Sequence, residues 1–329
     1  KKSHSKTIII GFRQFLYISG TESGHITGKT LRSLHKGTNL FNARVITRNG
    51  RITTEEAGVI AEAARLYGDG HMMMTTRLTI EVSGIAYHDI DAFCAHLAKA
   101  GLSVGGTGSK VRPVVSCKAT TCQYGLYDAY ALSDEIHTRF YQGYRGVSLP
   151  HKFKIATGGC PNNCVKPTLN DLGIVGARVP QYHIEDCRSC KKCQLEEACP
   201  IHAAKKNTDG KLEIDVELCN HCGRCIGKCP FHCNDEGVDG YKVYVGGRWG
   251  KKIAHGQMLH KIFTDKNEVL DTVEKAILLF RSAGESGERF ADTINRIGFA
   301  NAEKILLSDE LLQKKAEILG LDVVGGATC

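Results

Sequence analysis

Hydrophobic and polar positions recur with helical or strand periods along most of the chain. The stretch from Thr53 to Tyr67 begins with threonine and two glutamates, continues as an alanine-rich run and is followed by Gly68, which is typical of a capped helix. Residues from Met72 to Val82 are rich in threonine and β-branched side chains and predict a pair of strands. A second helix is predicted from His88 to Lys99. This succession predicts an α/β half-domain over residues 1–105.

The rest of the chain predicts a second α/β unit that is interrupted. Short strands are predicted at 111–116, 153–156, 172–175 and 241–245, and a helix at 124–140. Residues 183–235 are polar and rich in cysteine, without a long apolar period, which indicates an insertion. Val269, Val273, Ile277 and Phe280 recur at helical spacing and predict a mainly helical C-terminal region. We therefore expect one domain built from residues 106–182 and 236–329.

Cysteine usage separates this chain from an ordinary globular protein. It has 15 cysteines in 329 residues, and twelve of them fall into four tight groups. Grouped cysteines in a chain of this size, without a recognisable signal peptide, predict metal centres in a reducing, cytoplasmic compartment and argue against disulfides. No run of about 18 apolar residues is present, so we expect no membrane span.

Two of the groups have the spacing of bacterial ferredoxins. Cys219, Cys222, Cys225 and Cys229 precede Pro230, and Cys187, Cys190, Cys193 and Cys199 precede Pro200. In such runs the first three thiolates bind one [4Fe–4S] cluster and the fourth binds the other. This predicts two crossed ligand sets, with Cys229 joining the 187–193 group and Cys199 joining the 219–225 group, and an electron relay. Zinc is the alternative for either motif alone, and the presence of two motifs disfavours it.

A separate set consists of Cys117, Cys122, Cys160 and Cys164, placed where strands are predicted to end. Four thiolates are what a third [4Fe–4S] cluster needs. A structural zinc ion, or two pairs of buried core cysteines, stays open as an alternative.

The remaining cysteines and a methionine run have simpler interpretations. Cys94 lies in a predicted helix and is expected to be a core thiol. Cys233 exceeds the ligand count of the motif before it, and Cys329 is uninformative. Met72 to Met74 are expected to pack in the core.

Four segments resemble motifs of siroheme-dependent sulfite and nitrite reductases: TTRLTIEVSGI (75–85), LPHKFKIA (149–156), TGGCPNNCVKP (157–167) and YVGGRWG (244–250). Their order matches as well, and the insertion is similar to that of the catalytic subunit of dissimilatory-type anaerobic sulfite reductases. The resemblance covers residues 40–255. It implies an α+β or α/β fold in which residues 1–105 form a ferredoxin-like half-domain and siroheme domains carry an inserted 2[4Fe–4S] module. It also implies six-electron reduction of sulfite to sulfide.

The resemblance further implies roles for single residues. Cys164 would ligate both a cluster iron and the siroheme iron. Arg77 and Arg112 would clamp the sulfite oxyanion, while Lys152 and Lys154, two apart on one face of a predicted strand, would deliver protons. Siroheme contacts are implied for Thr76, Lys110, Asn163 and Arg248, with Gly246 and Gly247 near the macrocycle edge. The family commonly has five residues between its first two cysteines, whereas Cys117 and Cys122 have four between them.

Charge and the absence of a nucleotide motif indicate the partners. The net charge is +8 and the pI is near 8.7, which fits an oxyanion substrate and a polycarboxylate cofactor. The basic residues are dispersed, so nucleic acid is not favoured. No G-x-G-x-x-G motif follows a predicted strand, so we expect a separate electron-donor protein. Related reductases contain two pseudo-symmetric halves, which implies a homodimer or a heteromer with related subunits.

Three other functions stay open from the sequence. A siroheme nitrite reductase would have the same cofactors and the same basic residues. A non-catalytic iron–sulfur subunit for electron transfer is disfavoured, because all four cysteines and all four basic residues of the family pattern are present. A nucleic-acid-binding protein with a redox cluster is supported by the pI alone.

Overall fold

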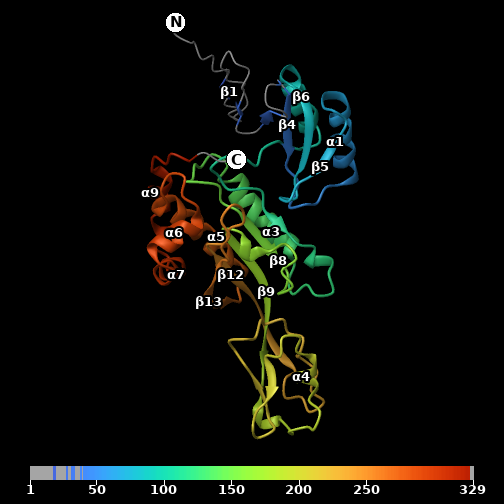
Figure 1. Ribbon diagram of the computed structural model, residues 1–329, viewed down its shortest axis with the longest axis vertical. Coiled ribbons are helices and arrows are strands. Elements are labelled where there is room, and N and C mark those ends of the chain that lie inside the picture. The colour runs from blue at the N-terminus through green and yellow to red at the C-terminus, as the bar shows by residue number, and fades with distance from the viewer. Residues whose placement is uncertain (1–17, 20–26, 29–30, 34–37, 39, 327–329) are drawn as a thin grey trace.

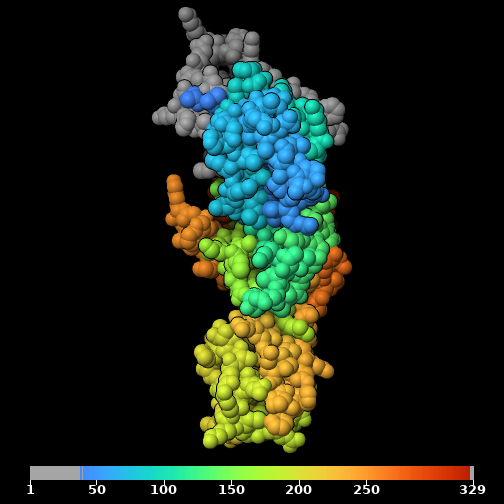
Figure 2. Space-filling view, turned by 90° about the vertical axis from the view of Figure 1, so that its right-hand side faces the viewer, coloured from blue at the N-terminus to red at the C-terminus, as the bar shows by residue number. Residues whose placement is uncertain are grey.

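The computed structural model describes residues 18–19, 27–28, 31–33, 38 and 40–326. They form three lobes along the long axis of the molecule (Figures 1 and 2). An α/β lobe lies at one end, a helix-covered sheet lies in the middle and the cysteine-rich segment forms the other end. The expected fold class, mixed α and β with a helical C-terminal region, is confirmed.

The N-terminal lobe contains a four-stranded antiparallel sheet. Across the sheet the strands are β3 (Leu31–Ser33), β4 (Leu40–Val45), β6 (Ile80–Ala86) and β5 (Met72–Met74). A separate strand pair is formed by β1 (Ile18–Ser19) and β2 (Thr27–Gly28), and the helical elements are α1 (Thr54–Tyr67), η1 (Tyr87–Asp89) and α2 (Ile90–Ala98). The core of the lobe lies between β4, β6 and the two helices.

A capping box accounts for the start of α1. The Thr53 hydroxyl oxygen accepts a hydrogen bond from the Glu56 N–H at 3.1 Å, and the Glu56 carboxylate accepts one from the Thr53 N–H at 2.7 Å. Both backbone donors would otherwise lack a helical partner. The helix ends at Gly68, where a Cβ would lie 2.7 Å from the Ser83 carbonyl oxygen. The prediction of a helix ending at Tyr67 is confirmed.

The prediction that Met72 to Met74 pack in the core is wrong. These residues form β5, at the edge of the sheet, and their side chains are 41%, 43% and 76% exposed. The apolar side chains of α1 and α2 meet those of β4 and β6. An edge strand outside that contact contributes little to the core.

The central lobe is a five-stranded mixed sheet. In order, its strands are β13 (Gln257–Phe263), β12 (Glu236–Val245), β9 (Leu172–Gln181), β8 (Ile155–Gly158) and β7 (Val115–Ser116). Strands β7, β8 and β9 are parallel, whereas β12 runs antiparallel to both of its neighbours. The carboxyl ends of β7 and β8 therefore lie side by side, and each is followed by a loop that carries cysteines.

Two predicted elements are longer than the observed ones. Pro113 has no N–H for a strand ladder, so the predicted strand at 111–116 is interrupted: Val111 forms a single bridge with Phe153, and the ladder covers only Val115–Ser116. The predicted helix at 124–140 begins late, because the Asp128 carboxylate caps α3 (Ala129–Ile136) by accepting from the Ala131 N–H at 3.0 Å. A π-helical segment, η3 (His137–Gln142), continues it.

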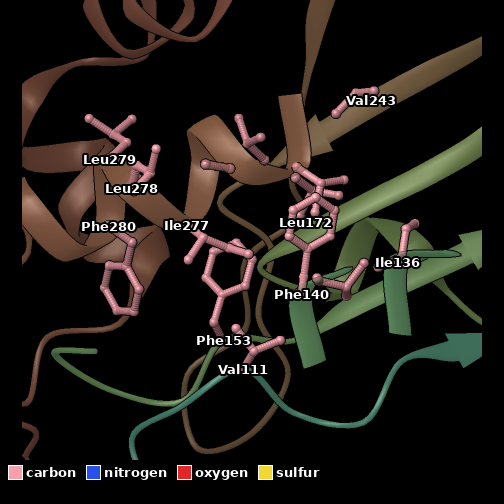
Figure 3. Close-up of a cluster of buried hydrophobic side chains, with 14 of the residues drawn as sticks. Val111, Ile136, Phe140, Phe153, Leu172, Val243, Ile277, Leu278, Leu279 and Phe280 are labelled. Atoms are coloured by element: carbon pink, nitrogen blue, oxygen red, sulfur yellow. The ribbon is translucent and has the colours of Figure 1, made fainter. Parts of the chain in front are cut away.

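The main core lies between the central sheet and the helices α3 and α5 (Lys266–Ala283). Figure 3 shows Phe140, Phe153, Leu172, Ile277 and Phe280 among its side chains. Phe153 is fully buried, as expected for the residue between two site lysines. In the described part of the chain, no helix combines the length and the apolar character that a membrane span requires.

Four shorter helices follow α5. They are α6 (Phe290–Ile297), α7 (Phe299–Leu307), α8 (Glu310–Gln313) and α9 (Lys315–Gly320). Arg281 of α5 donates from Nε to the Ile318 carbonyl at 2.9 Å, which ties α9 to α5. The Gly326 N–H donates to the Pro150 carbonyl at 2.9 Å, so the C-terminal segment lies against the loop before β8.

Strands β9 and β12 extend beyond the sheet as a two-stranded ribbon. They pair from Leu172 with Val245 to Gln181 with Glu236, which is longer than predicted. The ribbon carries the cysteine-rich lobe (Figure 1). Its elements are η5 (Ile184–Asp186), α4 (Gln194–Ala198), β10 (Ala204–Lys206) and β11 (Leu212–Ile214). Leu195, Ala204, Leu212 and Cys233 form its small core, and most of the grouped cysteines of the insertion pack around it.

Candidate active site

Four cysteines lie together on the loops that follow β7 and β8. Cys117 comes directly after β7, and the Gly159 N–H at the end of β8 donates to its Sγ at 3.1 Å. Cys160 and Cys164 follow on the loop after β8. Burial raises the pKa of Cys160, and the nearby Cys117, Cys164 and Cys122 raise it further. The two loops therefore bring the four thiols of this set within electrostatic reach of one another.

The short spacer between the first two cysteines is one 3₁₀ turn, η2 (Ala119–Thr121). The Cys122 N–H closes it by donating to the Ala119 carbonyl at 3.0 Å. The second loop approaches this turn closely, since a Cβ on Gly159 would lie 1.9 Å from the Ala119 Cβ. Glycine at 159 thus lets the shorter loop keep its two cysteines beside Cys160.

Arg77 reaches from the N-terminal lobe to the central sheet. It lies in the turn between β5 and β6, where the Thr75 and Thr79 hydroxyl oxygens are 2.6 Å apart. Its Nη1 donates to Asn170 Oδ1 at 2.7 Å, and its Nη2 donates to the Ile155 carbonyl at 3.1 Å. Burial lowers the pKa of Arg77, but a guanidinium keeps its proton near neutral pH.

A buried ion pair lies beside Lys154. The Asp171 side chain has no exposed surface, and both of its carboxylate oxygens accept from Arg289 Nη2 at 2.9 Å. The same carboxylate accepts from the Lys154 N–H at 2.9 Å. Burial, Arg77 and Arg289 lower the pKa of Lys154 to about 8. The Lys154 ammonium therefore releases its proton more easily than an exposed lysine does.

His151 lies among these basic side chains. The Lys152 N–H donates to His151 Nδ1 at 2.8 Å, so the neutral ring carries its proton on Nε2. Burial lowers the pKa of His151 to about 4, with further contributions from Arg289, Lys152, Arg112 and Lys154. The ring is therefore neutral near pH 7. Around it the structure gathers Arg112, Lys152, Lys154 and Arg289, and Arg77 lies near Lys154.

Backbone carbonyls orient two further basic residues. Arg112 is buried, its Nη1 donates to the Gly106 carbonyl at 2.8 Å and its Nε donates to the Gly108 carbonyl at 3.0 Å. Lys110 Nζ donates to the Arg145 carbonyl at 2.7 Å. Arg112 is thus fixed by the loop that enters β7, and Lys110 by the turn that follows η3.

The other expected siroheme contacts have mixed surroundings. Thr76 and Asn163 are exposed, next to Arg77 and Cys164 respectively. Arg248 is buried and pairs through Nη1 with Asp292 at 2.6 Å. A Cβ on Gly247 would lie 2.2 Å from the carbonyl oxygen of Thr168, in η4 (Pro167–Leu169), so the close backbone contact at this turn requires glycine.

Sequence motifs do not reveal the Asp171–Arg289 pair. The two residues are 118 positions apart, and Arg289 stands before a helix in a region without a recognisable motif. Asp171 does carry a signal, because a carboxylate directly before a buried strand needs a partner. His151 stands inside the LPHKFKIA segment, but its neutral state follows only from the cations around it.

Two cavities in the cysteine-rich lobe are lined by different cysteines. Cys187, Cys190, Cys193, Cys229 and Cys233 line one, and Cys199, Cys219, Cys222 and Cys225 line the other. Apart from Cys233, these are the crossed sets expected from the spacing. Among the residues that the structure describes, no three His, Cys, Asp or Glu side chains are close enough to hold a single metal ion.

The remaining cysteines differ in their surroundings. Cys233 is buried, and its Sγ lies 3.1 Å from that of Cys229. Cys94 packs against the core of the N-terminal lobe, as expected, and burial raises its pKa to about 11. Cys329 lies outside the described residues.

Comparison with known protein families agrees with this arrangement. Residues 107–315 match the nitrite and sulphite reductase 4Fe-4S domain, and residues 32–100 match the nitrite/sulfite reductase ferredoxin-like half domain. The chain belongs to the nitrite and sulfite reductase family. The residues that match the 4Fe-4S domain, 107–315, include all twelve grouped cysteines and the segment around Lys154.

Relatives of this family member include sulfite reductases. The chain is 31% identical over 265 residues to the coenzyme F420-dependent sulfite reductase of Methanocaldococcus jannaschii, covering 79% of this chain and 40% of that protein. It is 31% identical over 219 residues to one subunit of the anaerobic sulfite reductase of Salmonella typhimurium, covering 59% of this chain and 60% of that one. It therefore spans less than two thirds of either relative. The crystal structure of dissimilatory sulfite reductase I has a similar fold, with a TM-score of 0.63 at 21% identity over 81% of this chain and 69% of that chain.

Proposed function

We propose that this chain is a catalytic subunit that reduces sulfite to sulfide at a siroheme–[4Fe–4S] centre. Two further [4Fe–4S] clusters in the insertion would supply the electrons. The main support is that this one chain carries both a four-cysteine set and a group of basic side chains on its central sheet. A subunit that only relays electrons needs the cysteines but has no use for the basic group.

The basic group supports binding of a small oxyanion. Arg77, Arg112, Lys152, Lys154 and Arg289 lie close enough to depress the pKa of one another or of His151. A bound dianion relieves this mutual repulsion and accepts charge-assisted hydrogen bonds. We assign the arginines to holding the oxyanion and Lys154 to proton delivery, because its proton is the more easily released.

The donor set also fits the proposed cofactors. Siroheme, when bound, supplies the iron at which the sulfur–oxygen bonds are cleaved. Cys117, Cys122, Cys160 and Cys164 would hold the coupled cluster, and Cys164, the exposed member, would reach the siroheme iron. Thr76, Lys110, Asn163 and Arg248 would contact the macrocycle or its carboxylates.

Contacts with the ribbon support an order for the two proposed clusters of the insertion. The Arg178 N–H of β9 donates to the His221 carbonyl at 2.8 Å, and Lys242 Nζ of β12 donates to the Asn220 carbonyl at 2.9 Å. Both contacts fasten the loop between Cys219 and Cys222 to the ribbon. The 187–193 group follows the ribbon's end at Gln181. We therefore propose that electrons enter at the set containing Cys187 and pass through the set containing Cys219.

Assembly with a second subunit would complete the site. Lys154 precedes β8 and Cys160 follows it, so the basic group and the four-cysteine set lie toward opposite ends of one strand. The four residues of β8 alone extend over roughly 13 Å at the usual rise per strand residue. We propose a homodimer, or a heteromer with a related subunit, in which the basic group of one chain faces the siroheme bound by another.

Anaerobic purification followed by turnover tests the proposal. The protein should carry siroheme and should reduce sulfite to sulfide with a chemically reduced dye as donor. Faster turnover of nitrite than of sulfite would reassign it to nitrite reduction. Absence of siroheme from protein that has a full iron content would leave only the electron-transfer role.

A further inference from the structure

Within the described part of the chain, the side chains of Tyr127, Tyr182 and Asn234 have no hydrogen-bond partner at any of their polar atoms. Tyr127 and Tyr182 are the tyrosines there whose hydroxyl is buried without a hydrogen bond. Asn234 is fully buried, and its side-chain Nδ2 and Oδ1 both lack a hydrogen-bond partner. A buried group left unpaired costs about 1–3 kcal/mol. Three such groups call for an acceptor or donor outside the polypeptide.

Tyr127 lies beside the four-cysteine set. The neighbouring Leu126 N–H donates to the Gly159 carbonyl at 3.0 Å, which holds this segment next to Cys160. The Tyr127 ring packs on β9, where a Cβ on Gly176 would lie 2.9 Å from its Cδ1. Burial raises the pKa of the hydroxyl, and Cys117 raises it further. Thr157 lies close by as well, but without hydrogen-bond geometry.

The same relationship occurs twice in the insertion. Tyr182 packs with Cys187 and Cys193 against the small core of the cysteine-rich lobe, so it lies at the set that contains Cys187. The Asn234 carbonyl accepts from the Gly227 N–H at 2.8 Å, two residues after Cys225, and the Asn234 side chain lowers the pKa of the Cys225 thiol, so Asn234 lies at the set that contains Cys219. Each of the three cysteine sets thus has an unpaired polar side chain next to it, and the set that contains Cys219 has, in addition, the buried Nδ1 of His221.

We infer that Tyr127, Tyr182 and Asn234 each donate a hydrogen bond to the iron–sulfur cluster of the adjacent cysteine set and thereby raise its reduction potential. The inference rests on the proposed function, because it requires a cluster on each set. Hydrogen bonds to cluster sulfurs are one of the factors that set the potential. Reduction adds negative charge to the cluster, so a donor stabilises the reduced form more than the oxidised form.

Potentiometric titration of the holoenzyme, followed by EPR, tests this inference. Tyr127→Phe removes one hydroxyl and keeps the ring. At a fixed potential, the ratio of reduced to oxidised siroheme-coupled cluster should fall about tenfold, as expected for one lost hydrogen bond to a charged acceptor. Tyr182→Phe should produce the same shift in the cluster on the Cys187 set and leave the coupled cluster unchanged.

Tyr241→Phe is the matched control. Its ring stacks edge-on against Tyr127, with centroids 4.9 Å apart, so this variant perturbs the same packing without removing the proposed donor. All potentials should stay as in the wild type. Unchanged potentials in Tyr127→Phe, at wild-type iron and siroheme content, would overturn the inference and leave the proposed function standing. Too little iron for three clusters in the wild type would overturn both.

Discussion

Arg289 places one guanidinium nitrogen 2.9 Å from both carboxylate oxygens of Asp171, across 118 residues of sequence. Arg289 is the N-cap of α6, and Asp171 directly precedes β9. The pair therefore joins the helical C-terminal region to the sheet at the point where Lys154 is anchored. The C-terminal helices consequently help to position the basic group.

Asp171→Asn should destabilise the protein strongly. The substitution leaves Arg289 buried without its counter-charge, and breaking such a pair costs about 3–5 kcal/mol. Asp239→Asn is a suitable control, since its pair with Arg178 is exposed and worth about 1 kcal/mol or less. The midpoint of anaerobic thermal unfolding, followed by circular dichroism, should fall for the first variant and barely move for the second. Equal midpoints would contradict a stabilising role of the Asp171–Arg289 pair.

Cofactor content should match the twelve grouped cysteines. Anaerobically purified protein should contain about twelve cluster irons and one siroheme iron per chain, because each [4Fe–4S] cluster takes four thiolates. Iron, sulfide and siroheme assays measure this directly. Stoichiometric zinc, or iron sufficient for one cluster only, would contradict the assignment of three clusters.

Local signals predict much of the fold. The capping box at Thr53 and Glu56 fixes the start of α1, and Phe153 lies in the core as its place between two lysines indicates. Core packing was wrongly predicted for Met72 to Met74, because an apolar run does not indicate whether its strand lies in the centre or at the edge of the sheet. The length of the β9–β12 ribbon was not predictable either, because its outer residues, such as Gln181 and Glu236, lack strand character.

The candidate site, too, was predictable from the sequence only in part. Cysteine spacing predicts which residues share a cavity in the insertion, because a short spacer restricts which sulfurs can meet. The partners of Lys154 come from distant segments, and only the folded chain brings Arg289 to Asp171. The depressed pKa of Lys154 depends on those neighbours, so no motif reports it.

Cys222→Ser should separate electron delivery from catalysis. The variant should lose most of its turnover with a protein donor, because the relay through the Cys219 set is interrupted. Turnover with a small reduced dye that reaches the siroheme directly should be largely kept. Cys94→Ser is the control, since Cys94 belongs to the N-terminal core and to none of the four groups. Equal loss with both donors, in protein that retains siroheme, would argue against a pure relay.

Complementation should show whether sites are shared between chains. Lys154→Met and Cys164→Ser each inactivate one part of the proposed site, so each homomeric variant should be inactive. Coexpressed with separate tags and purified as a mixed dimer, the two should regain about half of the wild-type activity if one site draws Lys154 and Cys164 from different chains. An inactive mixed dimer would show that each site takes Lys154 and Cys164 from the same chain.

Lys154 should control the pH dependence of sulfite reduction. Its pKa is lowered to about 8 by burial, Arg77 and Arg289, so the ammonium form is complete well below pH 8 and disappears as the pH rises through that value. Turnover by the wild type should therefore fall as the pH rises through about 8. Lys154→Arg keeps its charge over this range, so its turnover should be lower than that of the wild type but should not fall with rising pH.

Lys154→Met keeps the length of the side chain and removes both its charge and its proton. Sulfite binding should weaken by about 1.5–3 kcal/mol, the contribution of a charge-assisted hydrogen bond, and turnover should fall by roughly 10²–10⁴-fold. Partly reduced sulfur products should accumulate, because electrons continue to arrive while protonation is slow. Lys99→Met, at an exposed position in the N-terminal lobe, is the control. Steady-state kinetics with product analysis decides the outcome. A near-parental rate with sulfide as the only product would show that the proton comes from another group, and His151, whose Nε2 carries a proton beside Lys154, would be the next to test.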